Sequence, residues 1–240
     1  MSDFTKKVAI LQSNYIPWKG YFDLLNQADD FIFYDEVQYT SGDWRNRNRI
    51  KTAQGIPWLT IPVHQGKLSQ KIRETPVADP SWGARHWRKL MQAYARAPYF
   101  ELYRADLEKL YQCVHSKWLS EINQLFIQTI NDWLGIQTRL HVSDDFEKRT
   151  STDRTARLVQ LVQALGGTEY IVGPAAAAYL DPAQFAEAGI SLTWMSYEGY
   201  PEYRQLHGSF EHRLSVLDLL LNEGPEAPRY MLSFPDRIAL

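Results

Sequence analysis

Short apolar runs alternate with stretches of helical periodicity along most of the chain, and this alternation constrains the fold more than any other feature. Residues 8–11 form an apolar run that predicts a buried strand, and residues 30–35 predict a second strand. Between them, residues 20–28 place their apolar side chains near helical spacing. A strand, a short helix and a second strand form a βαβ unit, which joins parallel strands and brings loops to their carboxyl ends.

The same alternation returns in the second half of the chain. We expect strands at residues 139–142, 169–172 and 191–194, and helices at 153–165, 175–188 and 212–221. Strands that alternate with helices predict an α/β fold with a mainly parallel, Rossmann-like sheet. Residues 1–224 are therefore expected to form a single domain. Residues 225–240, which contain three prolines, are expected to form a C-terminal extension along its surface.

Two segments interrupt this alternation. Residues 44–51 and 56–63 alternate in polarity and are separated by Thr-Ala-Gln-Gly, which predicts a β-hairpin. Residues 81–134 have a helical pattern with pauses at Ala97-Pro98 and Gly135, which predicts two or three helices. We interpret residues 81–135 as a helical insertion in the domain.

The charges of the chain nearly cancel, since 26 Lys and Arg stand against 28 Asp and Glu and leave a net charge of −2. A chain so close to neutral has no overall field that would steer it to nucleic acid, so we expect no nucleic-acid partner. No apolar window approaches the roughly 18–20 residues of a membrane span. We therefore expect a cytoplasmic protein that does not cross a membrane.

The cysteine and histidine residues argue against two further classes of protein. The single Cys113 cannot form an internal disulfide, and its helical surroundings predict a small, buried apolar residue. The six histidines show no zinc-ligand spacing, so we expect no metal site. Phosphate-binding glycine loops and nucleophile-elbow motifs are absent from the sequence, and no motif names a cofactor.

The segment 44–51 is the most informative local feature. On a strand, residues two apart share a face, so one face would carry the four cations Arg45, Arg47, Arg49 and Lys51. The other face would carry Trp44, Asn46, Asn48 and Ile50. Four cations on one face repel unless an anion neutralises them, and the planar guanidinium of Arg suits carboxylate or phosphate. We interpret the face as a binding site for an anionic small molecule, with a charged edge strand that blocks aggregation as the alternative.

The first loop is the second candidate, because it follows a buried strand directly, where α/β enzymes place ligand contacts. Its polar and aromatic residues are the expected walls of a pocket: Gln12, Asn14, Tyr15, Trp18 and Tyr21. A polar turn that only caps the next helix is the alternative. Gln38, after the second strand, and the polar-aromatic Tyr203 and Gln205 near the end of the chain are further candidate contacts.

Two residues are candidates for proton transfer. Asp35 ends the second predicted strand and is the candidate general base by position, with His64 at the end of the hairpin as the second choice. Offsetting the nearby arginines is the alternative role for Asp35 and Glu36. His86 is more simply interpreted as a structural histidine.

Several blocks of the sequence resemble the WbqC-like family, which is found among bacterial O-antigen and surface-polysaccharide gene sets. The blocks are AILQSNYIPWKGYF at 9–22, ADDFIFYD at 28–35, VQY at 37–39, WRNRNRIK at 44–51, WLTIP at 58–62 and YRQ at 203–205. The resemblance implies a transferase, and specifically the transfer of a glycyl or related aminoacyl group to a sugar. A nucleotide sugar, a nucleotide or an acyl donor would then be the anionic partner of the arginines.

A weaker resemblance connects residues 17–32 to class I nucleotidyltransferases. Gly20 and the Leu24-Leu25 pair fit the turn of that fold, but Trp18 and Tyr21 stand where its two phosphate-stabilising histidines would be. An aromatic ring cannot stabilise phosphate charge as a histidine does. The other functions that we consider are therefore a nucleotidyltransferase-like enzyme, an adenylate-forming amide ligase, and a non-enzymatic protein that binds a ligand, single-stranded nucleic acid or another protein.

Overall fold

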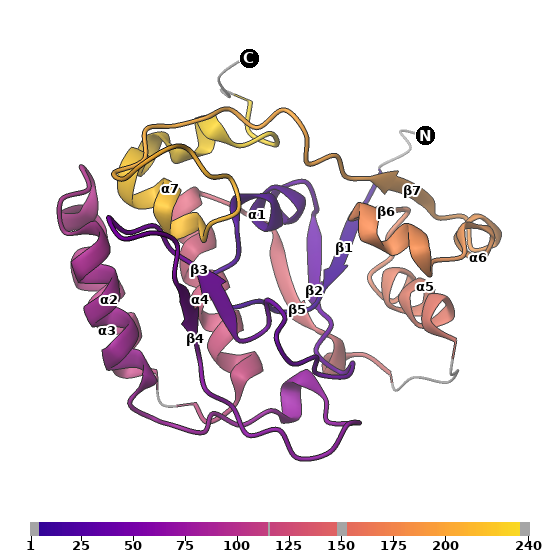
Figure 1. Cartoon of the computed structure of the whole chain (residues 1–240). Helices are drawn as coiled ribbons and strands as arrows, with labels where there is room; N and C mark the ends of the chain where they lie inside the picture. The colour runs from indigo at the N-terminus through magenta and orange to yellow at the C-terminus, as the bar shows by residue number, and fades with distance from the viewer. Residues whose placement is uncertain (1–4, 115, 148–152, 236–240) are drawn as a thin grey trace.

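Five strands form one parallel sheet at the centre of the molecule (Figure 1). The computed structural model describes residues 5–114, 116–147 and 153–235, so the last five residues of the expected extension lie outside the described residues. The strands are β1 (Lys7–Leu11), β2 (Asp30–Phe33), β5 (Arg139–Val142), β6 (Glu169–Val172) and β7 (Ser191–Trp194). They lie in the order β5-β2-β1-β6-β7, with β1 in the middle. The sheet confirms the predicted α/β fold.

Both faces of the sheet are covered. Strands β1 and β2 are joined by α1 (Lys19–Asn26), and Ala9 on β1 belongs to the same hydrophobic core as Leu24 on α1. Val8 and Ile10, which point to the opposite face of β1, pack in a second core with Leu161 of α5 (Arg154–Ala164). Because successive side chains of a strand alternate between its faces, a strand buried on both sides needs an unbroken apolar run, as residues 8–11 provide.

The segment 81–134 forms three helices: α2 (Trp82–Tyr94), α3 (Phe100–Cys113) and α4 (Leu119–Leu134). Gly135 ends α4 in a left-handed conformation with φ 72°, which glycine adopts without strain. Ile130 of α4 shares its core with Phe31 of β2 and with Leu220 of α7 (Val216–Glu223). Helix α4 therefore shares the hydrophobic core that covers one face of the sheet.

The hairpin is present but shorter than predicted. Strands β3 (Arg47–Arg49) and β4 (Trp58–Thr60) pair antiparallel as a separate two-stranded sheet. Short 3-10 helices occur at Ile72–Glu74, Ser143–Asp145, Pro174–Ala178 and Gly224–Tyr230. The last of these lies in the segment that we expected to be a C-terminal extension.

Two predicted helices differ from those observed. The helix expected at 175–188 is divided into a 3-10 turn and α6 (Pro182–Glu187), because Asp181 caps Ala183 N and Pro182 begins a new helix. The helix expected at 212–221 begins only at Val216, since the Ser215 side chain accepts a hydrogen bond from Leu217 N as its cap.

Cys113 was predicted to be buried and is exposed, because it is the last residue of α3.

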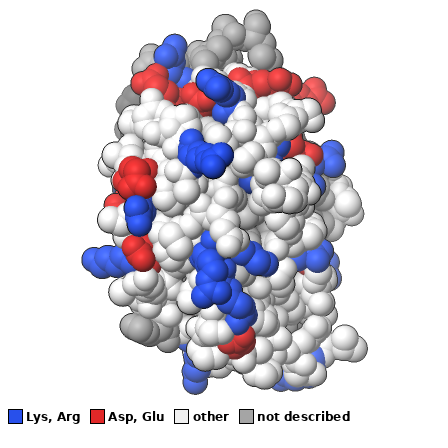
Figure 2. All heavy atoms as spheres, turned by 60° about the vertical axis from the view of Figure 1, so that its left-hand side comes forward, with Lys and Arg blue, Asp and Glu red and all other residues white. Residues whose placement is uncertain are grey.

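Charge is distributed in small groups over the surface. On the face shown in Figure 2, Lys and Arg side chains gather in several separate groups with wide uncharged areas between them. Within the described part of the chain, no helix has the length and apolar character that crossing a bilayer requires.

Candidate functional site

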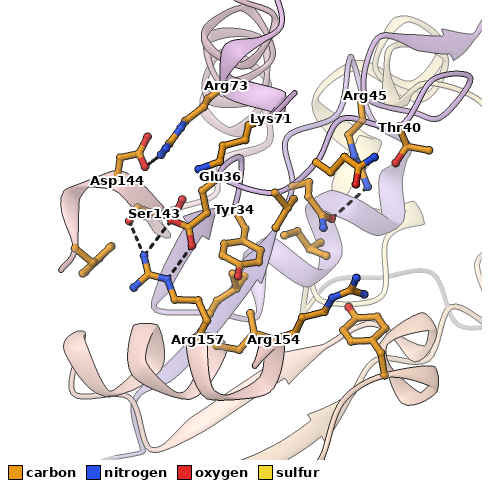
Figure 3. Close-up of a pocket in the computed structure, with 18 of the residues that line it drawn as sticks. Tyr34, Glu36, Thr40, Arg45, Lys71, Arg73, Ser143, Asp144, Arg154 and Arg157 are labelled. Carbon is orange, nitrogen blue, oxygen red and sulfur yellow. Dashed lines mark hydrogen bonds and ion pairs between the residues drawn. The ribbon is translucent and has the colours of Figure 1, made fainter. Parts of the chain in front are cut away.

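The larger of two adjoining pockets has a volume of about 1110 Å³ and lies at the carboxyl edge of the parallel sheet; we call it the polar pocket (Figure 3). Its walls include Leu11 and Gln12 at the end of β1, Tyr34 after β2 and Ser143 after β5. The connection from β1 leads to β2 on one side, whereas the connection from β6 leads to β7 on the other. The crevice at such a switch point is where open α/β sheets bind ligands.

The charges that line the polar pocket are mainly positive. Five lining residues are Lys or Arg, namely Arg45, Lys71, Arg73, Arg154 and Arg157, and two are acids, Glu36 and Asp144. Figure 3 shows Arg45, Lys71 and Arg73 on one side of the pocket and Arg154 and Arg157 on the opposite side, on α5. The pocket therefore presents an excess of cationic groups from two sides.

Two of these cations are neutralised within the protein. Arg157 donates two hydrogen bonds to the Glu36 carboxylate, at 2.8 and 3.1 Å, and its side chain is only 1% exposed. Arg73 forms an ion pair with Asp144. These contacts link α5 to the segment after β2, and the 3-10 helix Ile72–Glu74 to the turn after β5.

The remaining three cations are less fully matched. Arg45 has Asp43 at 3.5 Å, and neither Lys71 nor Arg154 forms an ion pair with a described carboxylate. Burial raises the pKa of the Tyr179 hydroxyl, while Arg154 and Arg45 act on that pKa in the opposite direction. Both guanidinium groups thus act on one hydroxyl at the pocket wall.

The first loop is held firmly between the two pockets. Ser13 N donates to Asp35 at 2.8 Å, and Tyr15 N donates to Trp44 O at 3.1 Å. Arg45 donates to the side-chain oxygens of Asn14 and, at 3.2 Å, of Gln12. Every residue from 12 to 15 therefore makes a defined polar contact with another element.

A second pocket of about 520 Å³ lies on the other side of this loop; we call it the aromatic pocket. Asn14 and Trp18 from the loop line it, as do Trp44 and Asn48 from the hairpin segment. Arg45 lines the polar pocket and bonds to Asn14, which lines the aromatic one, so the contact between these two side chains separates the two pockets.

Some of the residues predicted to contact a ligand line the polar pocket, some line the aromatic pocket, and the rest line neither. Three of them line the polar pocket, namely Gln12, Gln38 and Arg45. Two line the aromatic pocket, namely Asn14 and Trp18. The others lie outside both pockets.

The expectation that four cations of the segment 45–51 share one face is wrong. Only residues 47–49 are extended, and Arg45 lies in a turn that directs it to the first loop. Arg47 and Arg49 lie over the Trp58 ring, with their guanidinium carbons 4.2 and 5.8 Å from its centroid. Lys51 is buried and donates to Gln205 Oε1 and Ser209 O.

Several other predicted contacts have internal partners. The hydroxyl of Tyr21 donates to Gln12 O, and Asn46 Nδ2 donates to Ile61 O. Tyr203 donates to the buried Asp218, and Gln205 in turn donates to the Tyr203 hydroxyl. These side chains hold the first loop, the hairpin and the segment after β7 in place.

The two candidates for proton transfer also lie outside the pockets. Asp35 is 3% exposed and accepts hydrogen bonds from Ser13 N, Ser120 Oγ and Gln124 Nε2, so it joins the first loop to α4. His64 is exposed in the segment that follows β4.

Sequence reasoning missed most of the polar pocket. Lys71, Arg73, Arg154 and Arg157 come from segments more than 80 residues apart, and only the folded chain brings them together. One local signal was available, because Arg154 and Arg157 are three apart at the start of a predicted helix and so share a face. The described residues contain no cluster of three or more His, Cys, Asp or Glu that could hold a metal ion.

Comparisons with known proteins agree with the resemblance noted in the sequence. The model of the WbqC-like protein family matches residues 12–230. An uncharacterised protein of Mycobacterium tuberculosis is 48% identical over 227 residues, which cover 94% of this chain and 97% of that protein. No solved structure matches the chain.

Proposed function

This chain belongs to the WbqC-like protein family, and from that premise we propose that it is a transferase that binds a phosphate-bearing donor in the polar pocket. The observation that carries the proposal is the set of weakly matched cations, Arg45, Lys71 and Arg154, around a pocket at the carboxyl edge of the sheet. A guanidinium or ammonium group without a protein carboxylate is stabilised by an external anion, and Arg binds phosphate oxygens in a bidentate manner.

The size of the pocket favours a nucleotide that carries the acyl group on its phosphate over a single phosphate ion. Its volume of about 1110 Å³ lies just above the roughly 300–1,000 Å³ that is usual for pockets that hold small molecules and cofactors. Tyr34, Phe146 and Tyr170 supply apolar wall beside the charged groups. A flat base against such a wall, with its phosphates near Arg154 and Lys71, would use both kinds of surface.

The transferred group in this proposal is a glycyl or related aminoacyl group, and the acceptor is a sugar of a bacterial surface polysaccharide. In such a transfer, a hydroxyl or amine of the acceptor forms a bond to the acyl carbon, and the bond from that carbon to the phosphate-bearing leaving group breaks. The acceptor proton passes to a base, and the leaving group keeps the electron pair of the broken bond. The cations of the polar pocket would stabilise the charge that develops on that leaving group.

Thermal unfolding in the presence of UDP, ADP, UDP-glucose, acetyl-CoA and glycine tests the binding step, because a ligand of the folded state raises the unfolding midpoint. We expect the phosphate-bearing compounds to raise it and glycine alone to have no effect. Arg154→Gln and Lys71→Gln should each weaken binding roughly tenfold or more. Arg96→Gln is the matched control, since Arg96 is exposed outside both pockets. If no phosphate-bearing compound binds, or if the control loses as much affinity, the proposal is wrong.

A second candidate is an enzyme that activates its substrate with ATP and releases pyrophosphate. The observation that favours it is the strand order with β1 at the centre, because this places the loop of residues 12–18 at the nucleotide-binding edge of the sheet. Trp18 lines the aromatic pocket and Tyr21 is buried against Gln12, so neither aromatic residue lines the polar pocket. Release of pyrophosphate from ATP in the presence of an amino acid would distinguish this candidate from the first.

A further inference from the structure

The aromatic pocket has a composition distinct from that of the polar pocket. Four aromatic rings line it, namely Trp18, Trp44, Tyr197 and Tyr200. Trp18 makes an edge contact with Tyr197, with ring centroids 5.1 Å apart, and a tilted contact with Tyr200 at 5.6 Å. Trp44 is 40% exposed and packs on Trp58 at 5.2 Å. These contacts fix the rings before any ligand binds.

Its polar groups are few and mostly uncharged. Asn14 offers its Nδ2 amide group, whereas the Asn48 amide is fully engaged, because its Nδ2 donates to the carbonyls of Tyr15 and Ile16, at 3.3 and 2.7 Å, and its Oδ1 accepts from Arg49 N. Arg213 is the single permanent cation of the described lining, and the other titratable groups are His212 and the hydroxyls of Tyr197 and Tyr200. Burial lowers the pKa of the His212 imidazole and Lys19 lowers it further, whereas Glu202 and Glu211 act on that pKa in the opposite direction.

These groups argue against two kinds of occupant. An aromatic cage for a quaternary ammonium or a protonated amine would need electron-rich faces without competing positive charge. Here Arg213 already faces the pocket, and none of the described lining residues carries a carboxylate. A phosphate group would find one permanent cation here and five in the polar pocket.

We propose that the aromatic pocket binds the uncharged ring of a saccharide, which is the acceptor for the transferase of the previous subsection. A sugar ring presents C–H groups on its faces and hydroxyls at its rim. The aromatic rings pack against such a face, while the Asn14 amide, an arginine and a histidine bind hydroxyls. A pocket of about 520 Å³ has room for one or two such rings.

The position of the pocket supports the same assignment. Asn14 and Arg45 form the boundary between the pockets, so a saccharide on one side and a phosphate-bearing donor on the other would be separated by two side chains. This inference therefore rests on the proposed function for the role of acceptor, although binding of the sugar does not depend on it. For the acyl group to pass from the donor to the saccharide, the contact between Asn14 and Arg45 has to open, because reacting atoms must approach to about 3–3.5 Å.

Saturation-transfer NMR with methyl glycosides of glucose, N-acetylglucosamine and rhamnose tests the inference on the full chain. We expect at least one glycoside to bind in the millimolar range or tighter, and Trp44→Ala to weaken that binding at least tenfold. Trp194→Ala is the matched control, because Trp194 is similarly exposed, at 41%, but lies on β7 outside both pockets. Arg154→Gln should leave glycoside binding unchanged.

Three outcomes would overturn the inference: no glycoside binds, binding survives in the Trp44 variant, or adenosine or choline binds there in preference to every glycoside. Its failure can be told apart from failure of the proposed function by measuring UDP and ADP binding in the same samples. If Arg154→Gln abolishes UDP binding but no glycoside binds, only the saccharide assignment is wrong. If a glycoside binds through Trp44 but no phosphate-bearing compound binds, the saccharide site stands and the proposed donor site is wrong.

Discussion

The hydroxyl of Tyr15 lies 2.8 Å from Nδ1 of His86, and both side chains are buried. On the other side of the imidazole, Nε2 lies 3.1 Å from Thr60 O, which can only accept. Nε2 therefore carries the ring proton, and Nδ1 accepts from Tyr15. The hydroxyl of Tyr111, at 2.8 Å, can then donate to the Tyr15 oxygen. The chain of hydrogen bonds is complete with a neutral histidine and has no place for a second ring proton.

This arrangement predicts a specific loss of stability in mild acid. Burial lowers the pKa of His86 from 6.5 to about 4. Between these values the unfolded chain binds a proton that the folded chain does not, so the free energy of unfolding falls as the pH drops from 6.5 to about 4. The expected loss from this group is about 3 kcal/mol. We expect urea denaturation to show that the wild type and His86→Gln differ in free energy of unfolding by about 3 kcal/mol less at pH 4 than at pH 6.5. His64→Gln, at an exposed position, should keep the wild-type dependence, and parallel curves for wild type and the His86 variant would contradict the prediction.

The ion pair between Arg157 and Glu36 predicts that Arg157 contributes much more to the stability of the protein than Arg154 does, although both line the polar pocket. Arg157→Gln leaves the Glu36 carboxylate, 13% exposed, without its charged partner. We expect a loss of about 3–5 kcal/mol in the free energy of unfolding. Arg154→Gln, one turn away at an exposed position, should change it by less than about 0.5 kcal/mol. The double variant Arg157→Gln with Glu36→Gln should recover part of the loss, and equal effects of the two single variants would refute this account.

The close approach of Trp18 to α1 predicts that one methyl group would disturb the aromatic pocket. A Cβ atom at Gly20 would lie 2.3 Å from Cζ2 of the Trp18 ring, so Gly20→Ala requires the indole to move. At an exposed position inside a helix, a change from Gly to Ala would stabilise the protein by up to about 1 kcal/mol. We expect instead a lower unfolding midpoint and at least tenfold weaker glycoside binding, measured by calorimetry and NMR. Gly66→Ala is the control, since a Cβ there meets only Gln70 Oε1 at 3.5 Å. Undiminished glycoside binding in Gly20→Ala would mean that the Trp18 ring is not a necessary wall.

The three donors around Asp35 predict that Asp35→Asn destabilises the protein. An amide group would turn donor hydrogens toward Ser120 Oγ or Ser13 N, where the carboxylate accepts. Loss of hydrogen bonds to a charged group should lower the free energy of unfolding by about 1.5–3 kcal/mol. Urea denaturation of Asp35→Asn measures this loss, and Asp132→Asn is the matched control, because Asp132 is an exposed acid on α4. A variant as stable as the wild type but without turnover would instead favour the role of Asp35 as a general base.

The elements of the central sheet could be predicted because their signal is local. The runs at 139–142, 169–172 and 191–194 are the bounds of β5, β6 and β7. Only the run at 169–172 is largely buried; the edge strands β5 and β7 are partly exposed, and their place between helical segments located them. The position at which a helix begins was less predictable, since Ser215 and Asp181 act as caps within segments whose composition is helical throughout.

The candidate site was harder to predict, since its geometry is not local. The period-two rule placed Arg45 beside Arg47, but the rule holds only while the chain is extended, and Trp44 and Arg45 lie in a turn. Lys71 and Arg154 line the polar pocket because the start of the 3-10 helix Ile72–Glu74 and the start of α5 lie on opposite sides of it, and no spacing along the sequence encodes that arrangement. The first loop does follow β1, as the apolar run at 8–11 predicted, and its role in ligand contact stays a prediction.

The network around residues 12–15 has an energetic consequence for both pockets. A flexible loop must lose conformational entropy when a ligand orders it, and that loss subtracts from the affinity. Here the loop is already ordered by Asp35, Trp44 and Arg45 in the free protein. A ligand in either pocket therefore meets a preorganised wall, and its contacts with that wall contribute to affinity without the cost of ordering the chain.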